Sequence, residues 1–333
     1  MSTGLKYAVF GSGSWATAIV KMLCENSGQV DWYVRKQQTI DYILSEEHNP
    51  SYLSSVELNL DQLRLNTDIN KVAEAADVLI FAIPSAFIDK ELQKITTDIS
   101  SKIIMSAVKG IIPESGFLVG EHFHQQYGVD LKNIVVLSGP CHAEEVALER
   151  LSYLTIACVD LDVASTIADQ FSSNYIKTSA NDDVVGAEYA AMLKNIYAIA
   201  AGIAHGLGYG DNFQSVLMSN ATREMKRFIK KVHKMKRNIN ETVYLGDLLV
   251  TCYSLFSRNR MFGNMIGKGY TVKSAQMEMS MVAEGYYASK SAHQINQGKE
   301  KPAQIPIIDT VYDVLYMNKD AKKAFKKLTE KLG

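Results

Sequence analysis

The sequence predicts an α/β domain with a parallel, doubly wound sheet, followed by an all-α domain. Up to about residue 180, short apolar runs alternate with helical patterns, which is the order of elements that builds a parallel sheet. From about Asp182 the apolar residues recur at helical spacing, and positions 141–301 contain no proline. Because 333 residues exceed what one hydrophobic core usually holds, we expect two domains, 1–180 and 181–333.

The expected strands of the first domain are short apolar runs bounded by turn residues. The first run, Lys6 to Phe10, precedes Gly11-Ser12-Gly13 and a helical pattern that continues to Leu23. The following runs cover residues 29–34, 76–83, 102–108 and 133–137, and a last strand-like pair covers residues 154–159 and 174–178. Beyond them, the apolar segment 186–208 predicts a long helix of the second domain.

The composition is that of a globular protein without a strong overall charge. Hydrophobic residues make up 47% and charged residues 21%, and 35 Lys and Arg oppose 36 Asp and Glu for a net charge of -1. We therefore expect no nucleic-acid partner and no field that attracts an anionic membrane. The apolar N-terminal run is too short for a signal peptide or a membrane span, so no membrane insertion is predicted.

The cysteines and histidines predict neither disulfides nor a metal site. The four cysteines lie far apart without a C-x-x-C pair, which fits a reducing cytoplasm. His122 and His124 form an H-x-H pair, but no carboxylates accompany them at ligand spacing.

A Gly-rich turn follows the first expected strand. The segment Gly11 to Ala16, GSGSWA, matches G-x-G-x-x-G/A between a strand and a helix. Gly11 permits the tight turn, Gly13 lets the backbone approach a pyrophosphate, and Ala16 allows close packing of helix and strand. The pattern indicates a Rossmann-like dinucleotide-binding domain, with an ordinary glycine turn as the alternative interpretation.

The end of the second expected strand bears on the choice of cofactor. An acidic residue that binds the adenosine ribose is common there, whereas this chain has Arg35 and Lys36. Two cations favour the 2′-phosphate of NADPH, but a solvated basic strand end explains them equally well. Both NAD and NADP therefore remain candidates.

Three further features suggest chemistry on a phosphorylated substrate. Lys194 lies in an almost wholly apolar helix, where an amine is either a poised acid/base or a side chain that extends to solvent. Lys109 follows an expected strand at the carboxyl end of the sheet. The cluster Ser257-Arg258-Asn259 follows Asp247 and offers a hydroxyl, a guanidinium and an amide, a set that suits a phosphate.

Over nearly its whole length, the chain resembles the bacterial-type NAD(P)-dependent glycerol-3-phosphate dehydrogenases. The matching segments are GSGSWATA, NPSYL, ADVLIFAIPS, the KGI at Lys109, LSGPCHAEEVA, LKNIYAIAAGIAHGLGYGDN, GDLLVTC, SRNRMFG and VAEGYYASK. The resemblance implies hydride transfer from NAD(P)H to C2 of dihydroxyacetone phosphate, which gives sn-glycerol 3-phosphate for phospholipid synthesis.

The resemblance also implies roles for individual residues. Lys194 would transfer the proton, Lys109 would stabilise the alkoxide and Asp247 would hold the ammonium group. The implied substrate contacts are Lys109, Gly139, Cys141, Lys194, Asp247, Ser257, Arg258 and Asn259. The implied cofactor contacts are Gly11, Gly13, Ser14, Trp15, Arg35, Lys36, Tyr52, Lys109, Ala143, Arg258, Val282 and Glu284.

The chain departs from the family pattern after Pro140. Cys141 replaces the usual serine and His142 the usual aromatic residue, so we expect a weaker hydrogen bond to substrate. A catalytic thiol is not expected, because ketone reduction needs no nucleophile. A dehydrogenase for a 3-hydroxy acid or acyl-CoA, and a non-catalytic NAD(P)-binding sensor, are the alternative functions.

A basic segment and the oligomeric state are not explained by the motifs above. The run Lys226 to Arg237 contains seven cations mostly at helical spacing and predicts a solvated helix face rather than a nucleic-acid patch. The oligomeric state stays open, with a homodimer as the candidate.

Overall fold

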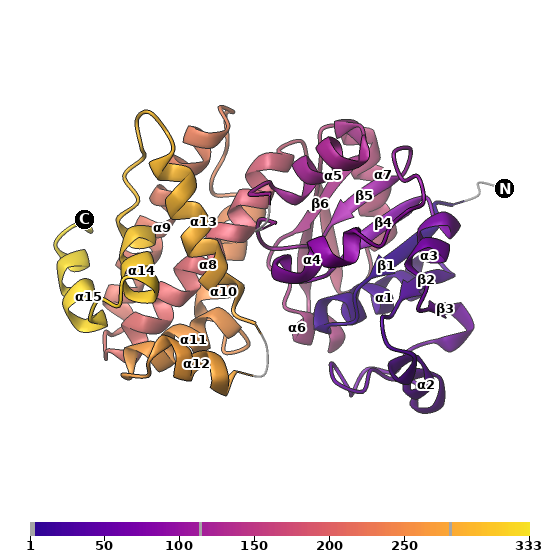
Figure 1. Cartoon of the computed structure of the whole chain (residues 1–333), viewed down its shortest axis with the longest axis horizontal. Helices are drawn as coiled ribbons and strands as arrows, with labels where there is room; N and C mark the ends of the chain where they lie inside the picture. Colours follow the sequence, from indigo (N-terminus) through magenta and orange to yellow (C-terminus); the bar gives the residue numbers. More distant parts are fainter. Residues whose placement is uncertain (1–3, 113–114, 280–281) are drawn as a thin grey trace. The chain divides into compact units, whose positions relative to one another are not determined.

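The computed structural model describes residues 4–112, 115–279 and 282–333 and divides into two compact units (Figure 1). Unit 1 comprises residues 1–108 and 117–184, and unit 2 comprises residues 109–116 and 185–333. The change of unit thus falls near the start of helix α8 (Val184–Gly206), and the segment after the fifth strand packs with unit 2.

Unit 1 is built on one sheet, in which the described residues form eight strands. Their order is β3-β2-β1-β4-β5-β6-β7-β8. The strands are β1 (Tyr7–Phe10), β2 (Val30–Tyr33), β3 (Leu63–Asn66), β4 (Val78–Phe81), β5 (Ile103–Ser106), β6 (Ile134–Ser138), β7 (Ser152–Cys158) and β8 (Ile176–Asn181). All neighbouring pairs are parallel except β6 with β7. The predicted doubly wound α/β class is confirmed.

Two features of the sheet were not expected from the sequence. Strand β3 lies at the sheet edge with a polar, half-exposed sequence, LRLN, so it lacks the apolar run that reveals the inner strands. Strand β7 runs antiparallel to β6. The intervening helix α6 (Ala143–Ala147) has only five residues, too few to carry the chain back along the sheet for a parallel crossover.

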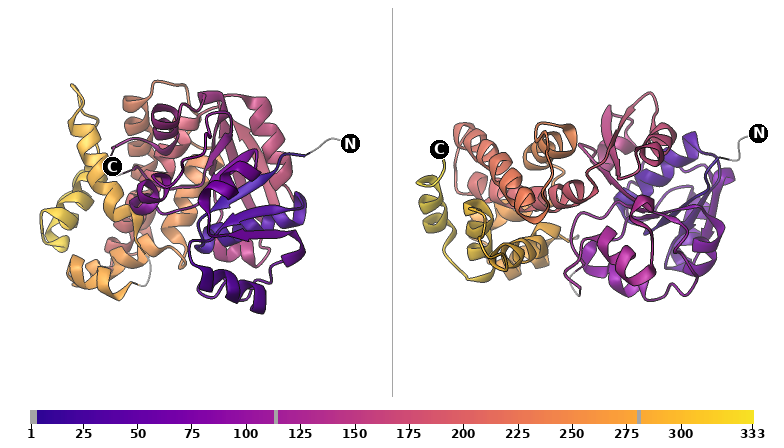
Figure 2. Two further views of the ribbon diagram at one scale, coloured as in Figure 1. Left: turned by 45° about the vertical axis from the view of Figure 1, so that its right-hand side comes forward. Right: turned by 90° about the horizontal axis from the view of Figure 1, so that it is seen from above.

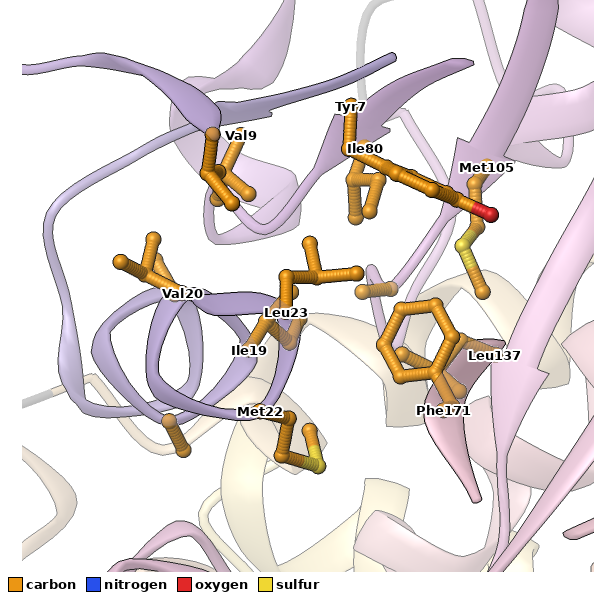
Figure 3. Close-up of a cluster of buried hydrophobic side chains, with 14 of the residues drawn as sticks. Tyr7, Val9, Ile19, Val20, Met22, Leu23, Ile80, Met105, Leu137 and Phe171 are labelled. Atoms are coloured by element: carbon orange, nitrogen blue, oxygen red, sulfur yellow. The ribbon is translucent and has the colours of Figure 1, made fainter. Parts of the chain in front are cut away.

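Side-chain alternation along the strands gives the sheet two buried faces. On one face, Tyr7 and Val9 pack with α1 (Ser14–Asn26) and α7 (Leu161–Phe171), as Figure 3 shows. On the other face, Phe81 stacks on Phe10 and contacts Phe123 of α5 (Val119–Tyr127). Because both faces are covered, β1 and β4 are buried at every residue. The other helices of unit 1 are α2 (Gln37–Glu46), α3 (Ile69–Ala75) and α4 (Ser85–Leu92), with 3-10 turns η1 (Leu60–Gln62) and η2 (Leu131–Asn133).

From residue 185 onward, the regular secondary structure of the described part of unit 2 is helical, which confirms the all-α expectation (Figure 2). Its elements after α8 are α9 (Asp211–Val232), the π-helical turn η3 (Thr242–Gly246), α10 (Asp247–Tyr253), α11 (Arg258–Gly267), α12 (Val272–Glu278), α13 (Glu284–Gln297), α14 (Pro306–Tyr316) and α15 (Ala321–Thr329). Within the described residues, none of the helices is long and apolar enough to span a bilayer.

Glycines set the close packing of α8 against α11. A Cβ on Gly202 would collide with the backbone of Arg260, and a Cβ on Gly263 would collide with the backbone of Ile199. Only hydrogen atoms at these positions let the two backbones touch. This contact fixes the polar start of α11 relative to α8.

The basic run is only partly helical. Helix α9 ends at Val232, so Lys226, Arg227, Lys230 and Lys231 lie on it with exposed side chains, whereas residues 233–237 lie beyond it. The expectation of a helix face is therefore correct for the first part of the run and wrong for the second.

Candidate functional site

The Gly-rich turn of unit 1 has the shape that phosphate binding requires. Gly11 has φ +117°, and a Cβ there would approach the carbonyl oxygen of Ala82 to 2.7 Å. At Gly13 a Cβ would meet nothing within 4 Å, so the backbone there is open to a ligand. Ala16 is fully buried against the sheet. Gly11 thus shapes the turn and Gly13 leaves room for a pyrophosphate.

The start of α1 completes this phosphate-binding geometry. No side-chain hydrogen bond caps the helix, and no acidic residue occupies its first turn, so the positive end of the helix dipole favours an anion there. The turn is fixed from two sides: Trp32 Nε1 donates to the Gly11 carbonyl at 2.6 Å, and Asn49 Nδ2 donates to the Ser12 carbonyl at 3.1 Å. The residues present therefore fit a dinucleotide.

Asn49 was not among the predicted site residues, although it begins the NPSYL motif. Its Nδ2 also donates to Thr17 Oγ1 at 2.9 Å, and its Oδ1 accepts from the Tyr52 backbone N–H at 3.1 Å. One buried amide therefore ties the Gly-rich turn to the segment that carries Tyr52.

The end of β2 presents the two predicted cations to solvent. Arg35 is 64% exposed in its side chain and lies 3.6 Å from Glu91, while Lys36 precedes α2 and is exposed. Burial opposes ionisation of Glu91, but hydrogen bonds from Lys94 and Tyr33 and the nearby cations hold its pKa below the usual range. Glu91 is thus a fixed anion that partly offsets the charge of Arg35.

The backbone conformation of the segment after β6 requires a glycine at position 139. This residue has φ +121°, and a Cβ would approach the Tyr153 carbonyl oxygen to 2.6 Å. Cys141 is buried, and its Sγ donates to the Gly139 carbonyl at 3.1 Å. Ala143 begins α6. The thiol therefore serves the local turn, consistent with a space-filling rather than a nucleophilic role.

In unit 2, Lys194 and Asp247 form a buried ion pair. Lys194 of α8 is 3% exposed and Asp247, the first residue of α10, is 1% exposed; Nζ donates to Oδ1. The alternative interpretation, that Lys194 extends to solvent, is therefore wrong. Burial of an unpaired ammonium would be costly, and the carboxylate compensates for it.

Next to Lys194, a chain of amide hydrogen bonds links four segments of unit 2. Asn195 Nδ2 donates to the Lys109 carbonyl at 3.2 Å, and Asn195 Oδ1 accepts from Asn259 Nδ2 at 2.9 Å. Asn259 Oδ1 accepts from the Gly285 N–H at 2.8 Å, in the first turn of α13. Asn195 therefore positions both the Lys109 segment and the start of α11. Its place beside Lys194 was the only sequence indication of this role.

The start of α11 carries the other predicted substrate residues. Ser257 is buried and accepts from the Arg260 N–H as the N-cap, and Arg258 is half-buried. The first turn contains no acidic residue. The helix dipole and the arginines together favour an anion here.

The structure assigns the predicted residues to two groups. Unit 2 holds Lys109, Lys194, Asp247, Ser257, Arg258, Asn259, Val282 and Glu284, and unit 1 holds Gly11, Gly13, Ser14, Trp15, Arg35, Lys36, Tyr52, Gly139, Cys141 and Ala143. The first six residues of unit 2 lie on the segments that the ion pair and the amide hydrogen bonds link. Glu284 begins α13, whose first turn is bound to Asn259 through the Gly285 N–H, and Val282 lies two residues before α13. Among described residues, no group of three or more His, Cys, Asp or Glu could hold a metal ion.

Comparison with known proteins identifies the family. Residues 6–164 match the NAD-dependent glycerol-3-phosphate dehydrogenase N-terminus, and residues 183–326 match the C-terminus of the same family. The chain belongs to the NAD-dependent glycerol-3-phosphate dehydrogenase family.

Relatives over almost the full length agree with this assignment. The glycerol-3-phosphate dehydrogenase [NAD(P)+] of Bacillus pumilus is 34% identical over 97% of this chain and 93% of its own length. That of an Exiguobacterium strain is 36% identical over 96% and 94%. The crystal structure of the Coxiella burnetii glycerol-3-phosphate dehydrogenase has a TM-score of 0.89 at 26% identity and covers 98% of this chain and 99% of its own. The predicted family resemblance is confirmed.

Proposed function

We propose that this dehydrogenase catalyses the reversible, NAD(P)H-dependent reduction of dihydroxyacetone phosphate to sn-glycerol 3-phosphate. The observation that carries the proposal is the buried Lys194–Asp247 pair beside the Asn195–Asn259 hydrogen bond, in a chain that belongs to this family. Unit 1 would bind the cofactor through its Gly-rich turn, and unit 2 would supply the acid/base group.

Lys194 is the proposed proton donor. When bound at the Gly-rich turn, NAD(P)H would supply the hydride for C2, so that the carbonyl oxygen would need a proton. The Lys194 ammonium donates a proton to that oxygen and becomes a neutral amine, which regains a proton from water. Asp247 keeps the amine oriented through the buried ion pair. In the reverse direction, the neutral amine accepts the hydroxyl proton.

The phosphate would be held at the start of α11. Arg258 and the N–H groups in the first turn of α11 would provide positive charge for the phosphate, and Asn259 would contribute its side-chain amide to phosphate binding. Lys109, whose carbonyl is bound by Asn195, would stabilise the developing alkoxide. Gly139 and Cys141 are the remaining proposed substrate contacts, and the Cys141 thiol, which already donates to the Gly139 carbonyl, would offer the substrate only a weak sulfur acceptor.

The proposed cofactor contacts are those that the family resemblance implies. In unit 1 they are the turn residues Gly11, Gly13, Ser14 and Trp15, the cations Arg35 and Lys36, and Tyr52 and Ala143. In unit 2 they are Lys109, Arg258, Val282 and Glu284. The exposed Arg35 and Lys36 favour NADPH through its 2′-phosphate.

An absorbance assay at the nicotinamide band tests the reaction. Dihydroxyacetone phosphate should drive oxidation of NADPH and NADH, whereas a 3-oxoacyl-CoA or a 3-oxo acid should not. No oxidation with dihydroxyacetone phosphate would refute the proposal, and turnover of the CoA ester would favour the alternative dehydrogenase. Cytoplasmic location and assembly as a homodimer complete the proposal, to be tested by cell fractionation and sedimentation equilibrium.

A further inference from the structure

The two units carry large and opposite charges. Unit 1 contains 12 Lys and Arg against 23 Asp and Glu, a net charge of -11, and unit 2 contains 23 against 13, a net charge of +10. The net charge of -1 for the whole chain is the sum of these two opposite charges. An anionic surface would therefore attract unit 2 and repel unit 1.

Much of the positive charge of unit 2 is concentrated on helix α15. Its sequence, AKKAFKKLT, has no acidic residue, and Phe325 and Leu328 are buried. All four lysines, Lys322, Lys323, Lys326 and Lys327, are exposed. The helix is thus anchored through its apolar side, and the charged residues within it are all exposed cations, while the exposed acids Asp320 and Glu330 cap its two ends.

A second basic row comes from the C-terminal half of α9. Arg223, Arg227 and Lys230 recur at helical spacing with exposed side chains, and the only acidic residue after Arg223, Glu224, is buried. Both arginines bind the C-terminal part of the chain: Arg223 donates to the Gly333 carbonyl and Arg227 donates to the Gln304 carbonyl. Helix α14 packs against both α9 and α15, so the two rows belong to one region of unit 2 (Figure 1).

The arrangement of these cations is unfavourable for the isolated protein. Lys322 and Lys326, and likewise Lys323 and Lys327, are like charges at i,i+4 spacing. Lys322 and Lys323 also lie in the first turn of α15, where the helix dipole disfavours cations. A surface selected only for solubility would alternate the two signs. The pattern is instead suited to an anionic partner that neutralises all of them.

We propose that the basic surface of α15 and the second half of α9 docks this protein on an anionic lipid bilayer. Lysines on flexible stems suit a diffuse sheet of headgroup phosphates, and each adds to binding when it lies within a Debye length, about 8 Å at physiological ionic strength. The aromatic residues of these segments, Phe228 and Phe325, are buried, so the surface lacks the stacking platform typical of single-stranded RNA binding.

Docking on a membrane would place the product of the reaction where it is used, a step that rests on the proposed function. Glycerol 3-phosphate is a small hydrophilic anion, and its two hydroxyl groups are the acceptors for fatty acyl groups in phospholipid synthesis. Because the acylated products reside in the bilayer, the consuming acyl transfer takes place at the membrane surface. A docked dehydrogenase would release its product beside that reaction.

Vesicle sedimentation tests the proposal with a charge-matched control. The full-length protein is mixed with phosphatidylcholine vesicles, with or without phosphatidylglycerol, at low and high salt. The test variant combines Lys322→Gln, Lys323→Gln, Lys326→Gln and Lys327→Gln. The control combines Lys71→Gln, Lys90→Gln, Lys132→Gln and Lys177→Gln, all exposed in unit 1, and has the same net charge.

We expect the wild type to sediment only with phosphatidylglycerol vesicles and to be released by high salt. The α15 variant should bind on the order of 1,000-fold more weakly, the control should change less than about threefold, and both should keep the kcat/KM of the wild type in solution. Failure of the wild type to bind, or equal losses in the two variants, would overturn the proposal.

Three other outcomes would also overturn it. Tighter binding to polyuridylate than to the vesicles would indicate RNA. Salt-sensitive self-association in light scattering that the α15 variant abolishes would indicate a second copy. A parallel fall in kcat/KM would indicate substrate steering. Vesicle binding without reduction of dihydroxyacetone phosphate would instead refute the proposed function and leave the docking surface standing.

Discussion

Replacing Lys194 by Met separates the structural from the chemical role of the buried ion pair. The substitution keeps the volume but leaves the Asp247 carboxylate, 1% exposed, without its ammonium partner. Removing one partner of a fully buried pair costs about 3–5 kcal/mol, a fifth or more of the roughly 5–15 kcal/mol stability of a typical protein. Loss of the proton donor should independently lower kcat by roughly 10²–10⁴-fold.

The double variant Lys194→Met/Asp247→Leu provides the decisive comparison. Since it replaces both charges by apolar groups, most of the lost stability should return, while kcat should stay as low as in the single variant. Urea unfolding and the nicotinamide absorbance assay measure the two effects. Lys290→Met, at an exposed site of unit 2, is the control and should change stability by less than about 0.5 kcal/mol. A double variant as unstable as the single one, or near-normal kcat in either, would refute the reasoning.

Three other substitutions test separate parts of the structure. Gly263→Ala should force α8 and α11 apart and lower the free energy of unfolding in urea by several kcal/mol, on the order of other severe core changes. The control Gly210→Ala, where a Cβ meets nothing within 4 Å, should be nearly neutral. Equal effects of the two substitutions would contradict the proposed helix contact. Replacing Arg35 and Lys36 by Glu should raise KM for NADPH more than KM for NADH, and an unchanged ratio would show that they do not bind the 2′-phosphate. Burial raises the pKa of Glu224 from 4.5 to about 8. The protonated Glu224 therefore contributes fully to the free energy of unfolding below pH 4.5. This contribution falls by up to about 1.4 kcal/mol per pH unit as the pH rises to about 8. Glu224→Gln should lack this slope in urea unfolding across that range, and an identical slope would contradict the shifted pKa.

Features of the structure that depend on neighbouring residues in the chain could be predicted from the sequence. The Gly-x-Gly turn could be predicted because a strand, a turn and a helix start follow one another within ten residues. The long helix around Lys194 could be predicted from its apolar composition. Edge strand β3 and the direction of β7 could not, because neither a half-exposed strand nor a reversed pairing leaves a distinctive pattern in its own residues.

By itself, the sequence determined the fold class, the nucleotide-binding turn and which residue types were available for catalysis. Only the tertiary structure decided which of them act together: Lys194 meets Asp247 across 53 residues, and Asn195 meets Asn259 across 64. It also decided that the exposed cations of α9 and α15 belong to one region of unit 2, because α14 packs against both helices. The physical reason is that periodicity and turn chemistry depend on neighbours along the chain, whereas ion pairs, shared amides and surface fields depend on how helices pack.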